Sequence, residues 1–429
     1  MLVPKLRFKR EDGTEYPEWG NKSFANAFAP LNNNTFSRDM LSENGTVLNI
    51  HYGDILVKFG EVCDIQAMDI PKVNAEIDTS KYDELQDGDI ILADTAEDET
   101  VGKAIEIYHT GTSKVVSGLH TMACRPNDKY APKYMGYYIN SPTYHNQLLP
   151  YMQGIKVTSI GRKNIADTVI YYPADLEEQQ KIANFLSTVD EVIAQSESEV
   201  QNLEQQKKAA MQKIFSQEVR FKREDGTDYP EWEEKPFVSF CDVITKQTGF
   251  DYTKTIKRAL LTEQKDGTLP YLQTKNFTGI NFDYSTDYYI PIEVANQFER
   301  IILDRKCLLF SIVGASVGNI ALFPNTVKCF LSGAICVAKP IKEEWAAYLY
   351  HFMCSELGQS QIRNATKGSG QATITIEDIR AFSIKTPCLE EQRKIADFLS
   401  AYDEAISYAK QELDKWKELK KGLLQQMFV

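Results

Sequence analysis

Long apolar runs are absent from this 429-residue sequence, and so are the cysteine spacings of metal sites. Without a stretch of about 18 apolar residues, we predict no transmembrane helix and expect no membrane partner. The first residues, MLVPKLRFKRED, become charged too early for a signal peptide, so we expect a cytoplasmic protein. The eight cysteines never occur as CxxC, which favours free thiols in a reducing compartment.

Sequence signatures of catalysis are also missing. There is no NPPY or DPPY segment to hold a base for methyl transfer, and no GxxxxGK[ST] loop to bind ATP phosphates. The segment SIVGASVGN lacks GxGxxG spacing, so Gly314 and Gly318 predict a tight turn and not a cofactor loop. The five histidines are scattered and suggest no catalytic set. We therefore expect a non-catalytic chain without cofactor-binding or metal-binding residues.

Charge is distributed unevenly. The formal net charge of −12 by itself argues against nucleic acid as a partner. Residues 20–175 hold 13 basic and 20 acidic side chains, whereas residues 237–388 hold 16 basic and 14 acidic ones. Because a binding face needs only a local positive field, the net charge does not exclude DNA binding.

Two repeats share one spacing. The phrase RFKREDGTEYPEW at Arg7–Trp19 returns as RFKREDGTDYPEW at Arg220–Trp232, 213 positions later. Leu176–Phe215 aligns without a gap with Leu389–Phe428, again 213 positions later. Such repeats predict two related halves. We expect each phrase to be a structural joint that packs its tyrosine and tryptophan against a helix end, with Phe428 near the first copy.

The second repeat predicts two long helices. Its apolar residues follow a four–three spacing over five heptads, which is typical of a coiled coil, although two separate core helices are the alternative. Forty residues would make a rod about 60 Å long. Lys207 and Lys420 fall on the seam, where their stems can lie along it while the ammonium groups reach water. A role in fixing the register of the helices or in pairing with a partner is the alternative. The expected seam residues are Ile182, Leu186, Val189, Ile193, Val200, Leu203, Ile395, Leu399, Tyr402, Ile406, Leu413 and Trp416.

The regions between the repeats are dissimilar but show faint correspondences, such as Tyr134–Ser141 with Tyr348–Ser355. Short β-branched runs mixed with helical patterns predict an α/β (mixed α+β) fold. We expect a pseudo-two-fold repeat in which two similar domains are separated by a long antiparallel two-helix coiled coil. The predicted segments are a joint (1–19), a domain (20–175), a long helix (176–217), a joint (218–236), a domain (237–388) and a long helix (389–429).

This arrangement resembles the DNA-specificity subunit of type I restriction–modification systems over essentially the whole chain. The resemblance is carried by the duplicated LEEQ(Q/R)KIA(N/D)FLS helices, the duplicated RFKREDGT(E/D)YPEW phrases and the two dissimilar regions. It implies two target recognition domains, each reading one half of a split, asymmetric sequence in double-stranded DNA. It also implies a coiled coil that sets the unread gap and docks two modification (methyltransferase) subunits. Restriction (translocase–nuclease) subunits would join the complex, with S-adenosylmethionine and ATP on the partner subunits.

The DNA contacts are expected in loops rich in amides, hydroxyls and basic side chains. Amides and arginines read base edges, while lysines and hydroxyls mostly hold phosphate. Each stretch is also compatible with ordinary surface loop. The candidates are Gln153, Lys156, Thr158, Ser159, Arg162 and Lys163 in the first domain, and Gln273, Thr274, Lys275, Asn276, Ser311, Ser316, Lys367, Ser369, Gln371 and Thr373 in the second.

Two other classes of function remain open at this point. The net charge of −12 suits an interaction scaffold that does not read DNA, or an acidic mimic of DNA. The mixed α/β domains alone would also suit a free-standing enzyme. A mimic needs a continuous acidic face, whereas residues 237–388 are slightly basic.

Overall fold

The chain forms two compact units in a computed structural model that describes residues 3–154, 157–368 and 372–429. The first unit combines Met1–Gln195 with Leu413–Val429, and the second is Ser196–Glu412. Each contains one variable region and a part of each long helix. The predicted mixed α/β class is confirmed. Within the described residues, no helix is long and apolar enough to cross a bilayer.

The first unit is built from short elements. Strand β7 lies at the middle of the larger sheet of this unit, and all four residues of β7 are buried. That sheet has the order β2-β11-β7-β9-β5, and a second has the order β10-β4-β6-β3. Strand β1 pairs with β13, and β8 with β12. The bounds are β1 (Gly20–Ser23), α1 (Phe24–Ala27), β2 (Phe28–Pro30), η1 (Arg38–Met40), β3 (Leu41–Ser42), β4 (Val47–Ile50), α2 (Tyr52–Val57), β5 (Val62–Asp64), β6 (Lys72–Val73), β7 (Ile90–Ala93), β8 (Thr95–Ala96), β9 (Ala104–Tyr108), β10 (Lys114–Ser117), β11 (Thr121–Pro126), α3 (Tyr134–Asn140), α4 (Pro142–His145), η2 (Leu149–Tyr151), β12 (Thr158–Ser159), α5 (Arg162–Ala166) and β13 (Val169–Tyr172).

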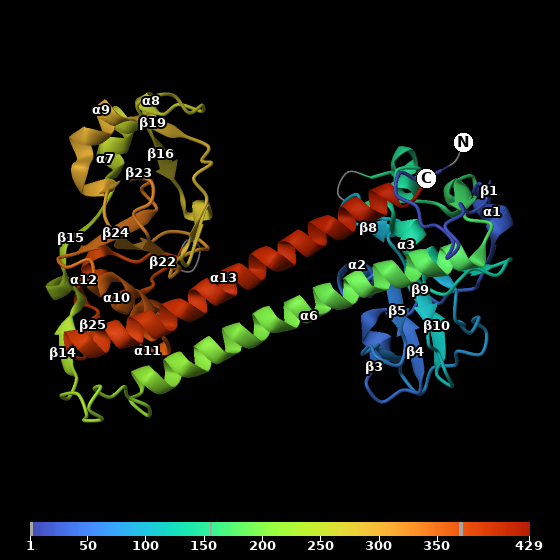
Figure 1. Cartoon of the computed structure of the whole chain (residues 1–429), viewed down its shortest axis with the longest axis horizontal. Coiled ribbons are helices and arrows are strands. Elements are labelled where there is room, and N and C mark those ends of the chain that lie inside the picture. The colour runs from blue at the N-terminus through green and yellow to red at the C-terminus, as the bar shows by residue number, and fades with distance from the viewer. Residues whose placement is uncertain (1–2, 155–156, 369–371) are drawn as a thin grey trace. The chain divides into compact units, whose positions relative to one another are not determined.

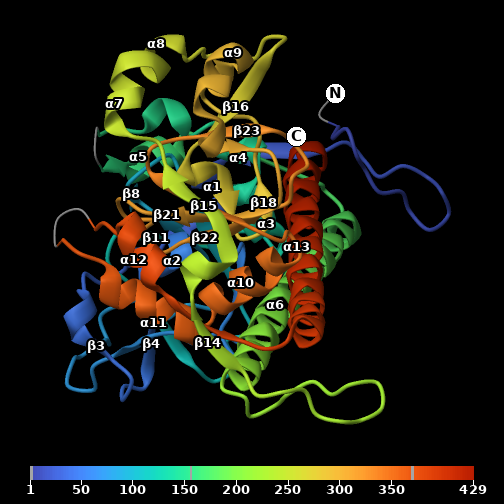
Figure 2. The ribbon, with the colours of Figure 1, turned by 90° about the vertical axis from the view of Figure 1, so that its left-hand side faces the viewer.

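The second unit has two four-stranded sheets, with the orders β15-β24-β21-β22 and β19-β16-β23-β20. Strand β14 pairs with β25, and β17 with β18. Figure 2 shows α7, α8 and α9 gathered around β16. The bounds are β14 (Glu233–Pro236), η3 (Phe237–Phe240), β15 (Cys241–Lys246), α7 (Gly249–Asp251), η4 (Tyr252–Ile256), α8 (Lys257–Ala259), β16 (Thr268–Leu272), η5 (Thr274–Asn276), β17 (Phe277–Thr278), β18 (Asn281–Phe282), β19 (Tyr289–Pro291), α9 (Ile292–Ala295), η6 (Asn296–Ile301), β20 (Ile302–Leu303), β21 (Cys307–Ser311), β22 (Ile320–Phe323), β23 (Cys329–Leu331), β24 (Ile335–Pro340), α10 (Trp345–Cys354), α11 (Glu356–Ala365), α12 (Ile376–Ala381) and β25 (Ser383–Thr386).

The two units share one topology. Strands β2, β11, β7 and β9 are joined by antiparallel pairings. Strands β15, β24, β21 and β22 follow in the same order with the same antiparallel pairings. In both units a parallel pair, β4 with β10 or β16 with β23, belongs to the second sheet. The predicted internal repeat therefore extends through the variable domains, where sequence similarity is faint.

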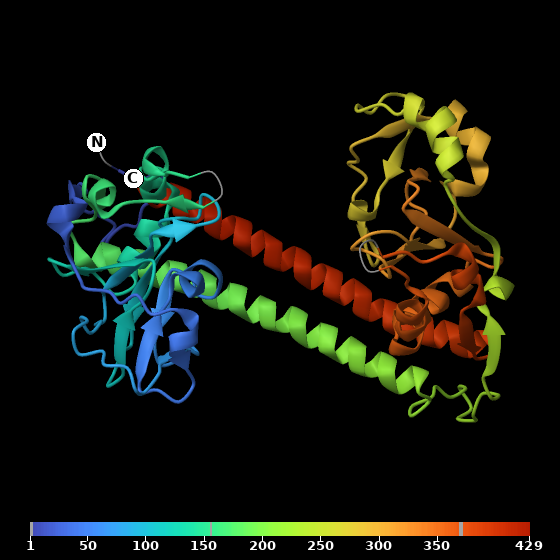
Figure 3. The same ribbon diagram turned by 180° about the vertical axis from the view of Figure 1, so that it is seen from behind.

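Two long helices, α6 (Leu176–Phe215) and α13 (Leu389–Gln426), are unbroken (Figure 1). In the first unit the start of α6 lies beside the end of α13, and Asp190 pairs with Lys420 at 2.6 Å (Figure 3). In the second unit the end of α6 lies beside the start of α13, and Lys207 pairs with Asp403 at 2.5 Å. Within each unit the two helices therefore run antiparallel.

The predicted seam residues divide by burial. The residues near the helix starts are packed into the domain cores, Val200 is buried further along α6, and the others are partly exposed. The buried ones are Ile182, Leu186, Val189, Val200, Ile395 and Leu399, and the partly buried ones are Ile193, Leu203, Tyr402, Ile406, Leu413 and Trp416.

The ammonium groups of the seam lysines meet carboxylates instead of extending into water, which agrees with the alternative that they fix the helix register. Lys420 Nζ lies 2.5 Å from Glu61 Oε2 as well as near Asp190. Equivalent cation–π contacts flank both lysines, from Lys420 to the Tyr137 ring and from Lys207 to the Tyr350 ring. Each lysine therefore ties a long helix to its partner helix and to the adjacent domain.

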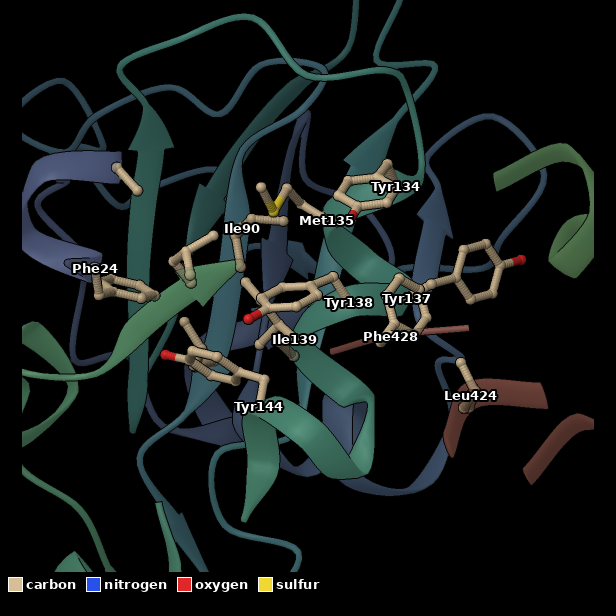
Figure 4. Packing of buried hydrophobic residues seen from close by; sticks show 14 of the residues in the cluster. Phe24, Ile90, Tyr134, Met135, Tyr137, Tyr138, Ile139, Tyr144, Leu424 and Phe428 are labelled. Carbon is tan, nitrogen blue, oxygen red and sulfur yellow. The ribbon is translucent and has the colours of Figure 1, made fainter. Parts of the chain in front are cut away.

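The repeated phrase forms a joint at the start of each long helix. Arg7 donates two hydrogen bonds to the buried carboxylate of Glu178, at 2.7 and 2.9 Å, and the Trp19 indole donates a third at 3.3 Å. The ring centroids of Trp19 and Phe428 lie 6.4 Å apart, so the predicted contact between the first phrase and the chain end is confirmed. Figure 4 shows Phe428 inserted among the tyrosines of α3.

Candidate nucleic-acid interface

Two of the predicted DNA-contacting stretches form hairpin loops at equivalent places. Gln153 and Ser159 exchange backbone hydrogen bonds of 3.1 and 2.8 Å. Lys367 and Thr373 exchange two of 2.9 Å. Both loops span the same number of residues and precede a short helix, α5 or α12, followed by the last strand of the domain. The structure therefore pairs these two stretches, as their order in the sequence suggested.

A glycine opens each loop with a backbone that other residues rarely adopt. Gly154 has φ +128°, and a Cβ added there would lie 1.8 Å from the carbonyl oxygen of Val157. Gly368 has φ +96°. Only glycine accommodates such a turn without strain, so the two loops bend sharply at matching points.

In the first unit the loop presents several candidate side chains to solvent. Gln153, Ser159 and Lys163 are exposed, and Thr158 is half-buried in β12 beside β8. Lys156 lies outside the described residues.

Arg162 is exposed but held in place, since its Nη2 donates to Asn33 Oδ1 at 2.7 Å. Asn33 in turn donates from Nδ2 to the Gly118 carbonyl oxygen at 3.3 Å. Asn33 is not among the predicted residues, and its only signal in the sequence is the run of three asparagines at 32–34. A guanidinium fixed in this way is preorganised to contact a base edge or a phosphate.

In the second unit the corresponding loop carries one exposed cation. Lys367 Nζ lies 3.7 Å from Asp378 Oδ1. Hydrogen bonds from the hydroxyl and amide of Thr375, with a smaller effect of Lys367, lower the pKa of Asp378. Thr373 is half-buried and bridges to Val313. Ser369 and Gln371 lie outside the described residues.

Thr274 to Asn276 form the short helix η5, and Gln273 precedes it as the N-cap residue. Lys275 is exposed and pairs with Asp287 at 2.5 Å, while Thr274 is half-buried. Asn276 is buried, and its Oδ1 accepts a hydrogen bond from the Gln273 amide at 2.9 Å. The prediction that Asn276 contacts DNA is therefore not supported in this conformation, because its side chain caps the turn from inside.

The two serines predicted at a turn also separate. Ser311 is the last residue of β21 and is buried between β24 and β22, so its hydroxyl is not on a surface. Ser316 is half-buried in the turn between β21 and β22. That turn contains Gly314 at φ +85° and Gly318 at φ +92°, as the tight-turn interpretation requires.

The described residues contain no group of three or more histidine, cysteine or acidic side chains arranged to hold a metal ion. All eight cysteines are free, and six are buried. Burial raises the pKa of Cys63 and Cys241 to about 12, so these thiols stay protonated and unreactive.

A family model shows what the chain is similar to. The model for the type I restriction modification DNA specificity domain matches residues 32–205 and 230–417.

Sequence comparison finds related specificity subunits. The chain is 26% identical over 381 residues to the putative type I restriction enzyme MjaX specificity subunit of Methanocaldococcus jannaschii, covering 86% of this chain and 82% of that protein. It is 21% identical over 308 residues to the type I restriction enzyme EcoBI specificity subunit of Escherichia coli, covering 65% of this chain and 61% of that protein.

Solved structures share the fold. The type I restriction–modification S subunit from M. genitalium matches with a TM-score of 0.58 and 14% identity, covering 100% of this chain and 99% of that one. A chain from a study of complex assembly and conformational transition in a type I R-M system matches with a TM-score of 0.54 and 18% identity, covering 95% and 97%. At these identities the likeness establishes the shared fold.

Proposed function

Since this chain belongs to the type I restriction–modification DNA specificity family, we propose that each of its two recognition domains reads one half of a split, asymmetric target in double-stranded DNA. One observation carries the proposal. The loops 153–159 and 367–373 occupy equivalent places, and matching pairs of backbone hydrogen bonds join their ends. The two loops nevertheless carry different side chains. Equivalent positions present two different surfaces to the same kind of ligand, so the two half-sites differ in sequence.

The long helices act as the spacer between the half-sites. Helix α6 has 40 residues without a break, which corresponds to about 60 Å at 1.5 Å per residue. Its residues near either end are buried in the domain cores. A stiff element anchored in this way sets the unread gap as a geometric property of the protein.

Two equivalent aromatic surfaces are proposed as docking sites for two modification subunits. In the first unit the rings of Phe8 and Phe185 meet edge to face at 5.7 Å. In the second unit Phe221 and Phe398 meet in the same way at 5.7 Å. Phe185 and Phe398 remain 39% and 40% exposed. Half-exposed aromatic side chains are common anchors in protein interfaces.

The identity of these surfaces points to one kind of partner. Exposed positions elsewhere on the helices have diverged, since Ser198 and Gln201 stand where the other copy has Gln411 and Asp414. Most surface substitutions cost little stability, so folding alone gives no reason to keep an exposed phenylalanine in both copies. Two like surfaces fit two copies of one partner.

The chemistry is assigned to partner subunits. The modification subunits would hold S-adenosylmethionine and methylate adenine, and the restriction subunits would use ATP to translocate and cut DNA. This chain, acting in the cytoplasm, supplies recognition and assembly. Its contribution to specificity is therefore measured on the assembled complex.

Methylation mapping tests this proposal. The chain is co-expressed with a modification subunit from a type I system in a host without other adenine methylation, and the methylated sites are sequenced. The expected result is one motif made of two different half-sites around a fixed gap. Adenine methylation without sequence preference, or a complex that binds all DNA equally at a stated salt concentration, would contradict it and favour an acidic mimic.

A further inference from the structure

A polar cavity of about 670 Å³ lies in the second unit between the ends of strands β15, β16 and β23. The segment from α7 to α8 covers one side, and the side chains of Lys246 and Lys257 line it. Its volume is in the range of small-molecule and cofactor sites. Of the predicted DNA-contact residues, Gln273 lines it, whereas the two hairpin loops 153–159 and 367–373 and the spacer helices do not.

The charge of the cavity is positive. Lys246 and Lys257 form no ion pair within the described residues, and none of the described residues that line the cavity is acidic. This is unusual in a chain with a net charge of −12. An uncompensated pair of ammonium groups in a concave site favours an anion such as a phosphate.

The wall of the cavity holds two hydrogen-bonding atoms without a partner. Gln273 Oε1 and Ser332 Oγ are buried and make no hydrogen bond within the described residues. A buried polar atom without a partner has lost its hydrogen bonds to water, and a ligand donor or acceptor would restore one. Beside them Tyr271 donates from its hydroxyl to Gln247 Oε1 at 3.1 Å, so the adjacent polar groups are already fixed.

Aromatic side chains complete the lining. Tyr252 and Tyr288 both line the cavity. Aromatic side chains stack on nucleobases, while amide and hydroxyl groups bond the base edges. A ligand with a planar heteroaromatic part and an attached phosphate matches all three properties of the site.

The equivalent place in the first unit is lined by different side chains. The Gly118 amide donates to the Ile50 carbonyl as the Ser332 amide donates to the Leu272 carbonyl, at 2.8 and 2.9 Å. There, a Cβ added to Gly118 would lie 2.7 Å from the Asn49 amide nitrogen, and Asn49 accepts from Asn34 at 2.7 Å. The second unit has Leu272 and Ser332 at these places, so the side chains around the cavity are particular to the second domain.

We propose that this cavity is a nucleotide-binding site, in which Lys246 and Lys257 hold the phosphate and Gln273 and Ser332 bond the edge of the base. The source of this nucleotide is the bound DNA, in which one nucleotide is turned out of the base stack at the second domain's half-site. That source rests on the proposed function, whereas the binding chemistry of the cavity does not. Unstacking one base costs free energy, and the contacts in the site offset this cost.

Free nucleotides test the chemistry of the site. The full chain is titrated calorimetrically with each of the four deoxynucleoside monophosphates. Binding is expected to weaken about tenfold or more in the variant Lys246→Met/Lys257→Met, which removes both phosphate contacts. The matched control is Lys254→Met/Lys265→Met, which removes two lysines that do not line the cavity and should leave the affinity unchanged within about twofold.

Ser332→Ala separates a binding role from a folding role. Because the hydroxyl has no hydrogen-bond partner within the described residues, its removal should leave the midpoint temperature of thermal unfolding unchanged or raise it. The affinity for the nucleotide should fall. A lower midpoint with unchanged affinity would assign Ser332 to folding and count against the site.

Experiments with labelled DNA identify the source of the bound nucleotide. The complex is mixed with duplexes that carry 2-aminopurine at each position of the second half-site, and a rise in fluorescence reports an unstacked base. A rise in fluorescence that disappears in the double lysine variant supports DNA as the source. Binding of a monophosphate without any rise in fluorescence supports a free nucleotide at the same site. The absence of both signals overturns the proposal, even when methylation mapping returns a split motif.

Discussion

The guanidinium of Arg220 donates two hydrogen bonds to the carboxylate of Glu391, at 3.2 and 2.9 Å, and Glu391 is fully buried. The pair repeats the contact between Arg7 and Glu178, which stand 213 positions earlier. Each glutamate lies in the first turn of a long helix, where its negative charge also suits the helix N-terminus. The repeated phrase therefore fixes each recognition domain to the start of its spacer helix.

Removal of this arginine should loosen one joint only. Arg220→Met leaves the Glu391 carboxylate buried without its ionic partner, which costs about 3–5 kcal/mol. Hydrogen–deuterium exchange should then speed up at the start of α13 and leave the start of α6 unchanged. The control Arg223→Met removes an exposed arginine of the same phrase and should alter exchange little. Equal acceleration at both helix starts would contradict independent joints.

The ion pairs of Lys420 predict a pH-dependent defect. Lys420→Met leaves Glu61 and Asp190 facing each other without a cation, at a cost of about 3–5 kcal/mol near neutral pH. Burial already raises the pKa of Asp190, so protonation should relieve much of the repulsion as the pH falls. Urea unfolding should show that the variant loses more unfolding free energy, relative to the wild type, at pH 8 than at pH 5. Exposed Lys421→Met serves as the control, and an equal loss at both pH values would argue against the pairing.

Glu106 should make the first unit less stable as the pH rises. Burial raises its pKa from 4.5 to about 7, although its carboxylate accepts hydrogen bonds from the amides of Lys133 and Gly136. The folded state therefore binds a proton between these values that the unfolded chain has lost. This stabilisation is complete below pH 4.5 and disappears as the pH rises through 7, by about 3 kcal/mol.

A glutamine variant isolates this effect. Glu106→Gln cannot titrate, so the difference in unfolding free energy between the wild type and this variant should shrink by about 3 kcal/mol from pH 5 to pH 8. Urea unfolding followed at the two pH values measures it. A constant difference would show that Glu106 keeps its ordinary pKa in the folded protein.

The aromatic docking surfaces predict stepwise loss of partners. Phe398→Ser should reduce the complex from two modification subunits to one, and Phe185→Ser should do the same from the other unit. The double variant should lose both. Native mass spectrometry counts the subunits, and Tyr408→Ser, which alters a more exposed aromatic residue on α13, is the matched control. Two bound subunits in the double variant would rule out these surfaces.

The repeats made the architecture predictable. Because the two copies of the phrase and the helix start are nearly identical, they make matching contacts, such as Trp232 with Glu391 and Trp19 with Glu178. Helix positions followed from heptad spacing, since that pattern is local. The partners of the seam lysines were not predictable, because Glu61 comes from a distant loop and reaches Lys420 only in the folded chain.

The candidate interface was predictable only in part. Loop composition located the two hairpins, but the burial of Ser311 depends on which strands flank β21, and strand order is a long-range property. The contact that holds Arg162 has the same origin, because Asn33 is 129 residues away in the chain. The cavity beside Gln273 arises where three strand ends meet, and composition gives no signal for it.

Exchange of one recognition domain tests the central claim most directly. Residues 237–388 are replaced by the corresponding domain of another specificity subunit, and the methylated motif of the assembled complex is sequenced. Independent reading by two domains on a fixed spacer predicts that one half-site changes while the other half-site and the gap length stay the same. A change in both half-sites, or an unchanged motif, would contradict the account.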